Sequence, residues 1–242
     1  MSSYSSLAAW YDQLTGDVPY QSFADFYETE FARVGGEFRL LLDFCCGTGT
    51  LTAELTRRGY EMIGVDASVD MLMQAQDKCA SLPTPPLILH QRAEELDLYG
   101  TVDAAICSLD GMNYLAPELL PEVFRRLHLF VRPGGLVLFD VRLPKWFRDL
   151  DGQIFLDEKD DVFCVWRADF QEAQNAIVYG MDLFERRGRL WQRSGEEHIE
   201  YAHDPEQLRT IMENAGFCNV VLHGDCPQND QGRLFISAIR GE

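Results

Sequence analysis

The chain has 242 residues, of which 46% are hydrophobic and 25% charged, which is ordinary for a soluble globular protein and enough for one large domain or a domain with an insertion. Its formal net charge of −18 disfavours DNA or RNA as a partner, because nucleic-acid affinity rests largely on basic side chains that neutralise phosphates. No apolar run approaches the roughly 20 residues that cross a bilayer, so we expect no membrane partner.

The cysteines and the N-terminus favour a cytoplasmic location. Residues Met1 to Tyr4 lack the basic and apolar regions of a signal peptide. The seven cysteines form no Cys-x-x-Cys pair and are scattered through apolar segments. Reduced, buried thiols are therefore expected.

An aromatic stripe marks the first helix. Phe23, Tyr27 and Phe31 recur at helical spacing, and Gly35-Gly36 ends the pattern. An irregular aromatic stretch from 11 to 20 precedes it. We interpret residues 1–36 as an N-terminal helical cap, and two roles stay open for its first part: a static cover on the core, or a lid that closes over a cofactor.

A glycine turn follows the first predicted strand. The apolar run 39–44 contains Asp43 near its end and is followed by small residues around Gly47 and Gly49. A side-chain-free turn after a parallel strand lets a ligand approach the backbone and the N-terminus of the next helix. A second apolar strand ends in Asp66, placed to accept hydrogen bonds from ribose hydroxyls. Together these features predict a site for an adenosine-containing cofactor.

The spacing within this turn separates two cofactor classes. A dinucleotide fingerprint has three glycines, but here Cys45 takes the first position and Thr52 the third. The segment Asp-x-x-Cys-Gly-Thr-Gly, followed by Gly-Val-Asp-Ala-Ser at 64–68, instead resembles the class I S-adenosylmethionine-dependent methyltransferases.

Apolar and helical patterns alternate along most of the chain, which predicts an α/β fold with a parallel, doubly wound sheet. Strands are expected at about 39–44, 61–65, 87–90, 102–107 and 135–140, and helices near 50–58, 68–80 and 117–131. A later helix, capped by Asp204 and ending at Gly216, precedes strands near 218–223 and 233–239. We therefore expect seven strands, mostly parallel, with an antiparallel hairpin at the C-terminus.

Residues 145–200 interrupt the alternation. An acidic stretch between 149 and 161 is most simply a solvated loop, and Gly188 marks a hairpin turn. Strand-like runs are expected at about 162–171, 176–185 and 189–199. This region is interpreted as an antiparallel β insertion that covers the substrate side of a core formed by 37–144 and 201–242.

The resemblance extends over nearly the whole chain and is closest to small bacterial methyltransferases that carry a Tyr-Asp-x-Leu segment near the N-terminus, here from Tyr11 to Tyr20. It implies S-adenosylmethionine as cofactor, with Asp66 on the ribose. The residues that it implies for the cofactor site are Tyr11, Tyr20, Asp43, Cys45, Gly47, Gly49, Asp66, Ala67, Met71, Ala93, Glu94, Ser108, Leu109 and Asp110. Arg92 departs from the family, which usually has an acid there to accept the adenine amino group, and a guanidinium can only donate.

The expected reaction is an in-line methyl transfer to a small-molecule acceptor, in which the cofactor supplies the reactivity. His198 and Tyr201 are the candidates for a general base, because they end the insertion that is expected to cover the pocket. No metal is expected, since Asp110 and Asp140 would need a third ligand where the chain has Val141. Two alternatives stay open: an NAD(P)-linked oxidoreductase, and a non-catalytic binding protein with the same fold.

Overall fold

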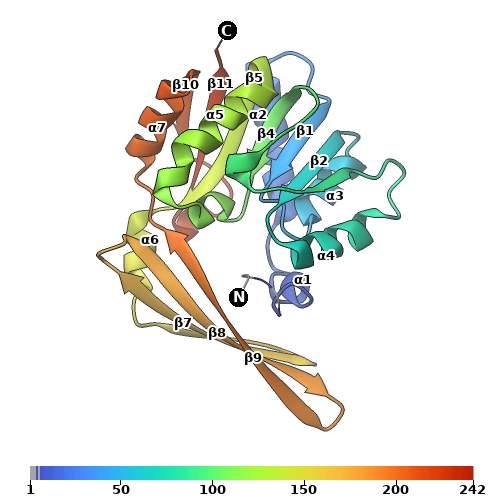
Figure 1. Cartoon of the computed structure of the whole chain (residues 1–242), viewed down its shortest axis with the longest axis vertical. Coiled ribbons are helices and arrows are strands. Elements are labelled where there is room, and N and C mark those ends of the chain that lie inside the picture. The colour runs from blue at the N-terminus through green and yellow to red at the C-terminus, as the bar shows by residue number, and fades with distance from the viewer. Residues whose placement is uncertain (1–3, 5, 242) are drawn as a thin grey trace.

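The seven-stranded sheet sets the architecture. The computed structural model describes residue 4 and residues 6–241, and its larger sheet has the order β10-β11-β5-β4-β1-β2-β3 (Figure 1). Only β11 runs antiparallel to its neighbours. The strands are β1 Leu40–Phe44, β2 Glu61–Asp66, β3 Leu87–His90, β4 Val102–Cys107, β5 Val131–Arg142, β10 Phe217–His223 and β11 Arg233–Arg240. The predicted seven-stranded fold with its C-terminal hairpin is confirmed.

The strand order reverses between β1 and β4. The chain moves outward from β1 through β2 to β3, then returns to the other side of β1 to form β4 and β5. In open α/β sheets a crevice forms at such a reversal, outside the carboxyl ends of the strands. The residues that follow β1, β2 and β4 therefore lie together at one edge.

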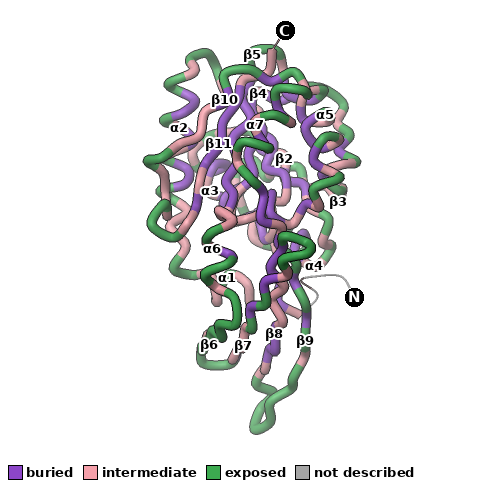
Figure 2. Tube along the Cα trace, turned by 90° about the vertical axis from the view of Figure 1, so that its left-hand side faces the viewer, coloured by how far each residue is buried: buried purple, intermediate pink, exposed green. Residues whose placement is uncertain are grey.

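Helices cover both faces of this sheet. Helices α2 and α3 pack on one face with α4 beside α3, whereas α5 and α7 pack on the other (Figure 2). The predicted stripe of α2 is confirmed, because Phe23, Tyr27 and Phe31 are buried against the sheet. The side chains of Ser68 and Asp204 cap α4 and α7. The bounds are α2 Tyr20–Val34, α3 Thr50–Arg57, α4 Val69–Cys79, α5 Leu120–Phe130 and α7 Pro205–Asn214.

The interruption forms a second, antiparallel sheet of four strands in the order β6-β7-β8-β9. Its elements are helix α6 Pro144–Asp149 and strands β6 Ile154–Lys159, β7 Val162–Gln171, β8 Ala176–Arg187 and β9 Leu190–Tyr201. The interpretation of the acidic stretch as a loop was wrong over β6. This strand pairs only with β7, and Ile154 and Leu156 are exposed, so its composition resembles that of a solvated segment.

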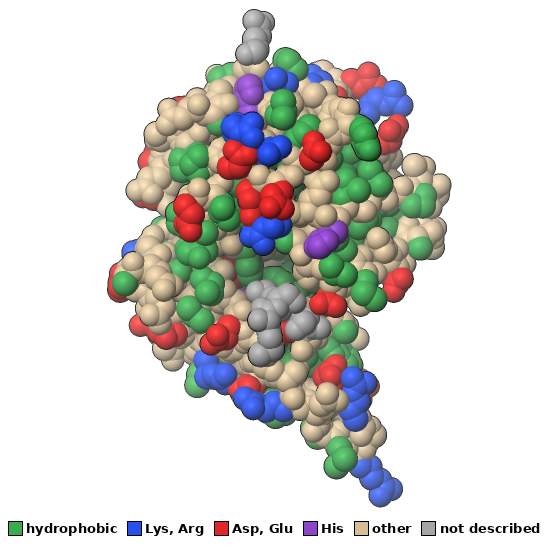
Figure 3. Space-filling model, viewed as in Figure 1, with side chains coloured by type: hydrophobic (Ala, Val, Ile, Leu, Met, Phe, Trp, Pro, Cys, Tyr) green, Lys and Arg blue, Asp and Glu red, His purple; other side chains and the backbone are tan. Residues whose placement is uncertain are grey.

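The second sheet projects from the carboxyl edge of the first (Figure 1), and the short helix α1 Tyr11–Leu14 contacts its strand β6. Basic side chains gather at its free end, where Arg186, Arg187 and Arg189 are exposed around the β8–β9 turn (Figure 3). Short 3-10 helices complete the fold at η1 Ala93–Glu95, η2 Gly111–Tyr114, η3 Pro117–Leu119 and η4 Asn229–Gln231.

Of the expected N-terminal segment, residues 1–3 and 5 lie outside the described residues, and with them most of the stretch assessed for a signal peptide. Among the described helices, none combines the length and apolar character needed to cross a membrane.

Candidate active site

The turn after β1 needs backbone that few side chains tolerate. Cys45, Gly47 and Gly49 all have positive φ, at 58°, 55° and 68°. A Cβ on Gly49 would stand 2.9 Å from the Cβ of Ala75, so only glycine lets this turn approach α4. A Cβ on Gly47 would meet nothing within 4 Å, because the space beside it is open. Gly49 therefore fixes the turn, while Gly47 leaves room next to it.

A cavity of about 360 Å³ opens beside this turn, at the carboxyl edge of the sheet. Of the fourteen residues implied for the cofactor, all line it except Gly49 and Asp110. They come from the N-terminal segment up to the start of α2, from β1 and the turn after it, the end of β2, α4, η1 and the loop after β4. The sequence thus located twelve residues that the fold brings together.

Asp66 closes the cavity at the end of β2. Its carboxylate accepts the backbone N–H of Gly47 at 2.8 Å and that of Ser68 at 2.8 Å. A carboxylate has about four lone-pair positions, so acceptor capacity remains for a diol. Burial raises the pKa of Asp66, and the backbone donors counteract part of that shift.

Asp43 is held by Thr52, the residue at the third position of the glycine turn. The Thr52 hydroxyl donates to the Asp43 carboxylate at 2.5 Å. Burial raises the pKa of Asp43 to about 7. The sequence reasoning used Thr52 only to exclude a dinucleotide turn and missed this support for an acid in the cavity wall.

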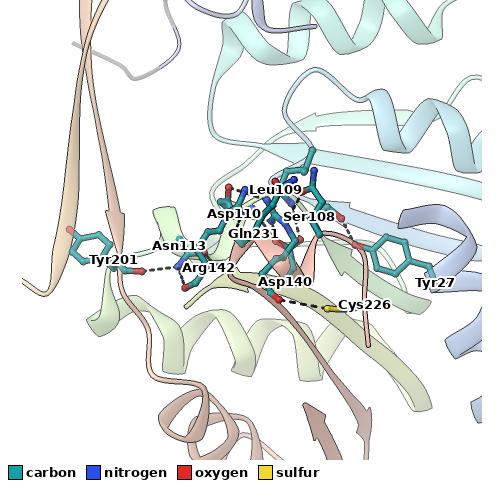
Figure 4. Close-up of polar contacts among 12 residues, drawn as sticks. Tyr27, Ser108, Leu109, Asp110, Asn113, Asp140, Arg142, Tyr201, Cys226 and Gln231 are labelled. Atoms are coloured by element: carbon teal, nitrogen blue, oxygen red, sulfur yellow. Dashed lines mark hydrogen bonds and ion pairs between the residues drawn. The ribbon is translucent and has the colours of Figure 1, made fainter. Parts of the chain in front are cut away.

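The loop after β4 is held in an uncommon conformation. Leu109 and Asp110 have positive φ, 56° and 69°, which non-glycine residues seldom adopt. Both donate their backbone N–H groups to the buried carboxylate of Asp140, at 2.8 and 3.3 Å (Figure 4). Ser108 is hydrogen-bonded to the buried Tyr27 of α2. These contacts fix the loop that lines the cavity.

Arg233 pairs with Asp110 and Asp140, the two acids that the sequence analysis weighed as metal ligands. Its guanidinium donates to Asp110 at 2.8 Å and to Asp140 at hydrogen-bond distance, and Arg142 pairs with Asp110 at 3.3 Å. Burial raises the pKa of Asp140, whereas the two guanidiniums hold that of Asp110 low against its own burial. The sequence reasoning missed Arg233, although an arginine that starts an apolar strand was a usable signal.

Comparison with known proteins identifies the class of enzyme to which this site belongs. A family model described as a methyltransferase domain matches residues 41–135. YqeM of Bacillus subtilis (strain 168), named as a candidate methyltransferase, is 29% identical and covers 99% of this chain and 98% of its own length. The crystal structure of an S-adenosylmethionine-dependent methyltransferase from Clostridium acetobutylicum ATCC 824 is 26% identical, with a TM-score of 0.86 over 100% of both chains.

The chain is a class I S-adenosylmethionine-dependent methyltransferase. The sugar N-methyltransferase KedS8 from Streptoalloteichus sp ATCC 53650 shares the fold at 20% identity, with a TM-score of 0.78 over 92% of this chain and 88% of its own. The comparisons give no support to the NAD(P)-linked alternative or to a non-catalytic protein.

The residues of this methyltransferase fit the cofactor of its family. An added Cβ on Gly47 would point into open space, as a backbone-lined cradle requires. Asp66 and Glu94 supply acceptors for hydroxyl and amino groups, and Met71 and Leu115 add apolar wall. Arg92 pairs with Glu94 at 2.5 Å, and its side chain is 57% exposed. The cavity wall therefore keeps an acid, Glu94, although Arg92 stands where the family usually has one.

A second cavity of about 410 Å³ adjoins the first in the methyltransferase and lies against the four-stranded sheet. The two share Tyr4, Tyr11, Leu109 and Tyr114 as wall. Asp110, absent from the first cavity, lines this one, and so does the buried Glu200 of β9. Burial, followed by the Asp110 carboxylate, raises the pKa of Glu200 to about 8.

His198 and Tyr201 line neither cavity. They are three residues apart on β9, so their side chains leave opposite faces of the strand. His198 is fully buried beside Glu196, 3.3 Å from its carboxylate. The carbonyl of Tyr201 accepts from Asn113 at 2.8 Å, and its ring points away from the Leu109–Asp110 loop (Figure 4). Their catalytic role stays a prediction that this geometry does not favour.

The N-terminal segment ties the two sheets of the methyltransferase together. The backbone N–H groups of Tyr4 and Leu7 donate to Glu196 of β9, at 2.9 and 3.2 Å. At the other end, Asp12 pairs with Lys78 of α4 at 2.7 Å and accepts from Thr48 of the glycine turn at 2.6 Å. This segment therefore supplies wall to both cavities and is anchored on both sides of them.

The Asp12 anchor gives a test of the lid. In Asp12→Ala the contacts to Thr48 and Lys78 are lost, so amide exchange in residues 6–18 should become faster. Binding of S-adenosylhomocysteine should weaken about three- to tenfold, the scale of part-exposed hydrogen bonds and ion pairs. Hydrogen-exchange mass spectrometry and calorimetry measure both effects, with the exposed Asp17→Ala as control. Slow exchange that neither the substitution nor the ligand changes would make the segment a static cover.

Proposed function

We propose that the enzyme binds S-adenosylmethionine in the first cavity and methylates a small molecule held in the second. When bound, the cofactor supplies a methyl group on a sulfonium centre, ready for displacement. The observation that carries the proposal is the common wall formed by Tyr4, Tyr11, Leu109 and Tyr114. These residues line both cavities where the two adjoin. Ligands in the two cavities would therefore be within reach of each other at this junction and shielded from water.

The protein's contribution would then be placement. Asp66 would hold the ribose and Glu94 the adenine end, while Asp43, supported by Thr52, would face the amino-acid end of the cofactor. The tyrosines of the N-terminal segment would cover the junction and keep it poor in water, which positions the reacting atoms. The structural neighbour KedS8 is a sugar N-methyltransferase, in keeping with a small-molecule acceptor for this enzyme.

The proposal also includes the cytoplasm as location. All seven cysteines are free, and Cys79, Cys107 and Cys164 are buried, in keeping with a reducing compartment. Cys45 and Cys46, adjacent in the glycine turn, are both thiols rather than a disulfide.

Ligand-dependent unfolding tests the cofactor assignment. A ligand at about 100 times its dissociation constant stabilises the native state by about 2.7 kcal/mol. S-adenosylhomocysteine at that excess should raise the melting temperature by about 5–10 °C, given the unfolding entropy of a chain of this size. NAD and NADP should leave it unchanged, and stabilisation by NAD alone would contradict the proposal.

A further inference from the structure

Aromatic and acidic residues line the second cavity. Its wall carries the rings of Tyr114, Trp166 and Tyr179 together with the carboxylates of Asp157 and Glu200. Ring faces attract cations, and they do so more strongly where water is excluded. No lysine or arginine is among the described residues that line it. Aromatic rings and acids together favour an ammonium group over a neutral or anionic ligand.

When Glu200 is ionised, the acids around it outnumber the guanidiniums. Asp110, Asp140 and Glu200 are three acids served by two guanidiniums, those of Arg142 and Arg233. Both guanidiniums pair with Asp110, and Arg233 also pairs with Asp140. Among the described residues, no basic side chain forms an ion pair with Glu200, which is only 7% exposed. A buried carboxylate in this position is costly unless it is protonated or meets a cation.

We propose that the methyl acceptor is an amine, which binds as its ammonium ion against Glu200 and gives a proton to that carboxylate before transfer. This inference rests on the proposed function of the two cavities. The ammonium proton moves to a Glu200 oxygen, which leaves a lone pair on nitrogen. The N–C bond then forms as the C–S bond of the methyl donor breaks, and its electron pair stays on sulfur.

The pKa of Glu200 suits a carboxylate that first pairs with an ammonium ion and then accepts a proton from it. Burial and Asp110 raise it to about 8, while Arg142, a hydrogen bond from Tyr114 and Arg233 counteract part of the shift. Alkylammonium ions resemble lysine and stay largely charged up to about pH 9. Binding of an ammonium ion would favour the ionised carboxylate, so amine affinity should rise from pH 6 to pH 9.

The experiment compares amines with alcohols of the same shape. The probes are 2-phenylethylamine and cyclohexylmethylamine, each against its alcohol, titrated by calorimetry into the full chain saturated with S-adenosylhomocysteine. Amines should bind at least about tenfold more tightly than the alcohols at pH 9, the scale of a charge-assisted hydrogen bond. In Glu200→Gln this preference and its pH dependence should disappear, while alcohol binding stays the same. The matched control is Glu197→Gln, an exposed acid on the same strand, which should behave as wild type.

The outcomes separate this inference from the function on which it rests. Equal binding of amines and alcohols, or a Glu200→Gln variant with unchanged amine binding, overturns the amine assignment. Wild-type amine affinity that is flat from pH 6 to 9 also overturns it, without any variant. A chain that does not bind S-adenosylhomocysteine at all would instead refute the proposed function.

Discussion

Replacing Arg233 with leucine should lower the free energy of unfolding by about 3–5 kcal/mol, the cost of removing one partner from a buried ion pair. Arg233 is 2% exposed and its guanidinium contacts both Asp110 and Asp140. Leucine fills part of the space but leaves these acids without their shared counter-charge. Chemical denaturation at pH 8 measures the loss, which would be among the largest for a single substitution in this chain.

The loss in Arg233→Leu should depend on pH. Without the guanidinium, the folded-state pKa of Asp140, which burial already raises, rises further, and that of Asp110 loses one of the two charges that hold it low, so the folded state of the variant binds more protons than that of the wild type. The deficit is then small below the unfolded pKa and grows as the pH rises through the raised folded values. Adding Asp140→Asn should recover part of it, because the amide oxygen still accepts the N–H of Leu109. A deficit under about 1 kcal/mol at pH 8 would mean that the ion pairs of Arg233 with Asp110 and Asp140 contribute little to the stability of the fold.

Asp66→Ala should weaken S-adenosylhomocysteine binding by about 1.5–3 kcal/mol, the contribution of charge-assisted hydrogen bonds to a half-buried carboxylate. Two effects add here: the acceptor for the ribose is lost, and the N–H groups of Gly47 and Ser68 lose the oxygen that orders the turn. Isothermal titration calorimetry measures the affinity directly.

The control for Asp66 is Asp77→Ala, an exposed acid on α4, which should bind as wild type. The Asp66 variant should still unfold cooperatively, because its side chain lies at a strand end and not among the core residues. Affinity equal to wild type would remove Asp66 from the binding site.

Local sequence was enough for the main sheet and the glycine turn. The turn after β1 depends on residues 43–52, and each strand of the main sheet carries its own apolar pattern, so neither needed knowledge of distant contacts. The departure from a dinucleotide turn was also visible locally, since Thr52 stands in place of a glycine. The hydrogen bond from Thr52 to Asp43 was found only in the structure.

Long-range contacts could not be found in the same way. Arg233 meets Asp110 across 123 positions of sequence, and no local pattern indicates which buried arginine serves which acid. On β9 the sequence did not indicate the register, that is, which side chains face the interior. Glu196, His198 and Glu200 share the buried face, whereas Tyr201 leaves the other. β9 is an edge strand of the second sheet, and its hydrophobic pattern was too weak to predict which of its side chains face the interior.

The two cavities differ in which parts of the chain build them. The first is formed mainly by segments that follow β1, β2 and β4, whereas most of the second comes from residues 4–15 and from the excursion between β5 and α7. Those outer parts contribute no strand to the seven-stranded sheet. The excursion between β5 and α7 also contributes no residue to the first cavity, so exchanging it alone between relatives should create chimeras with a new acceptor preference and unchanged donor binding.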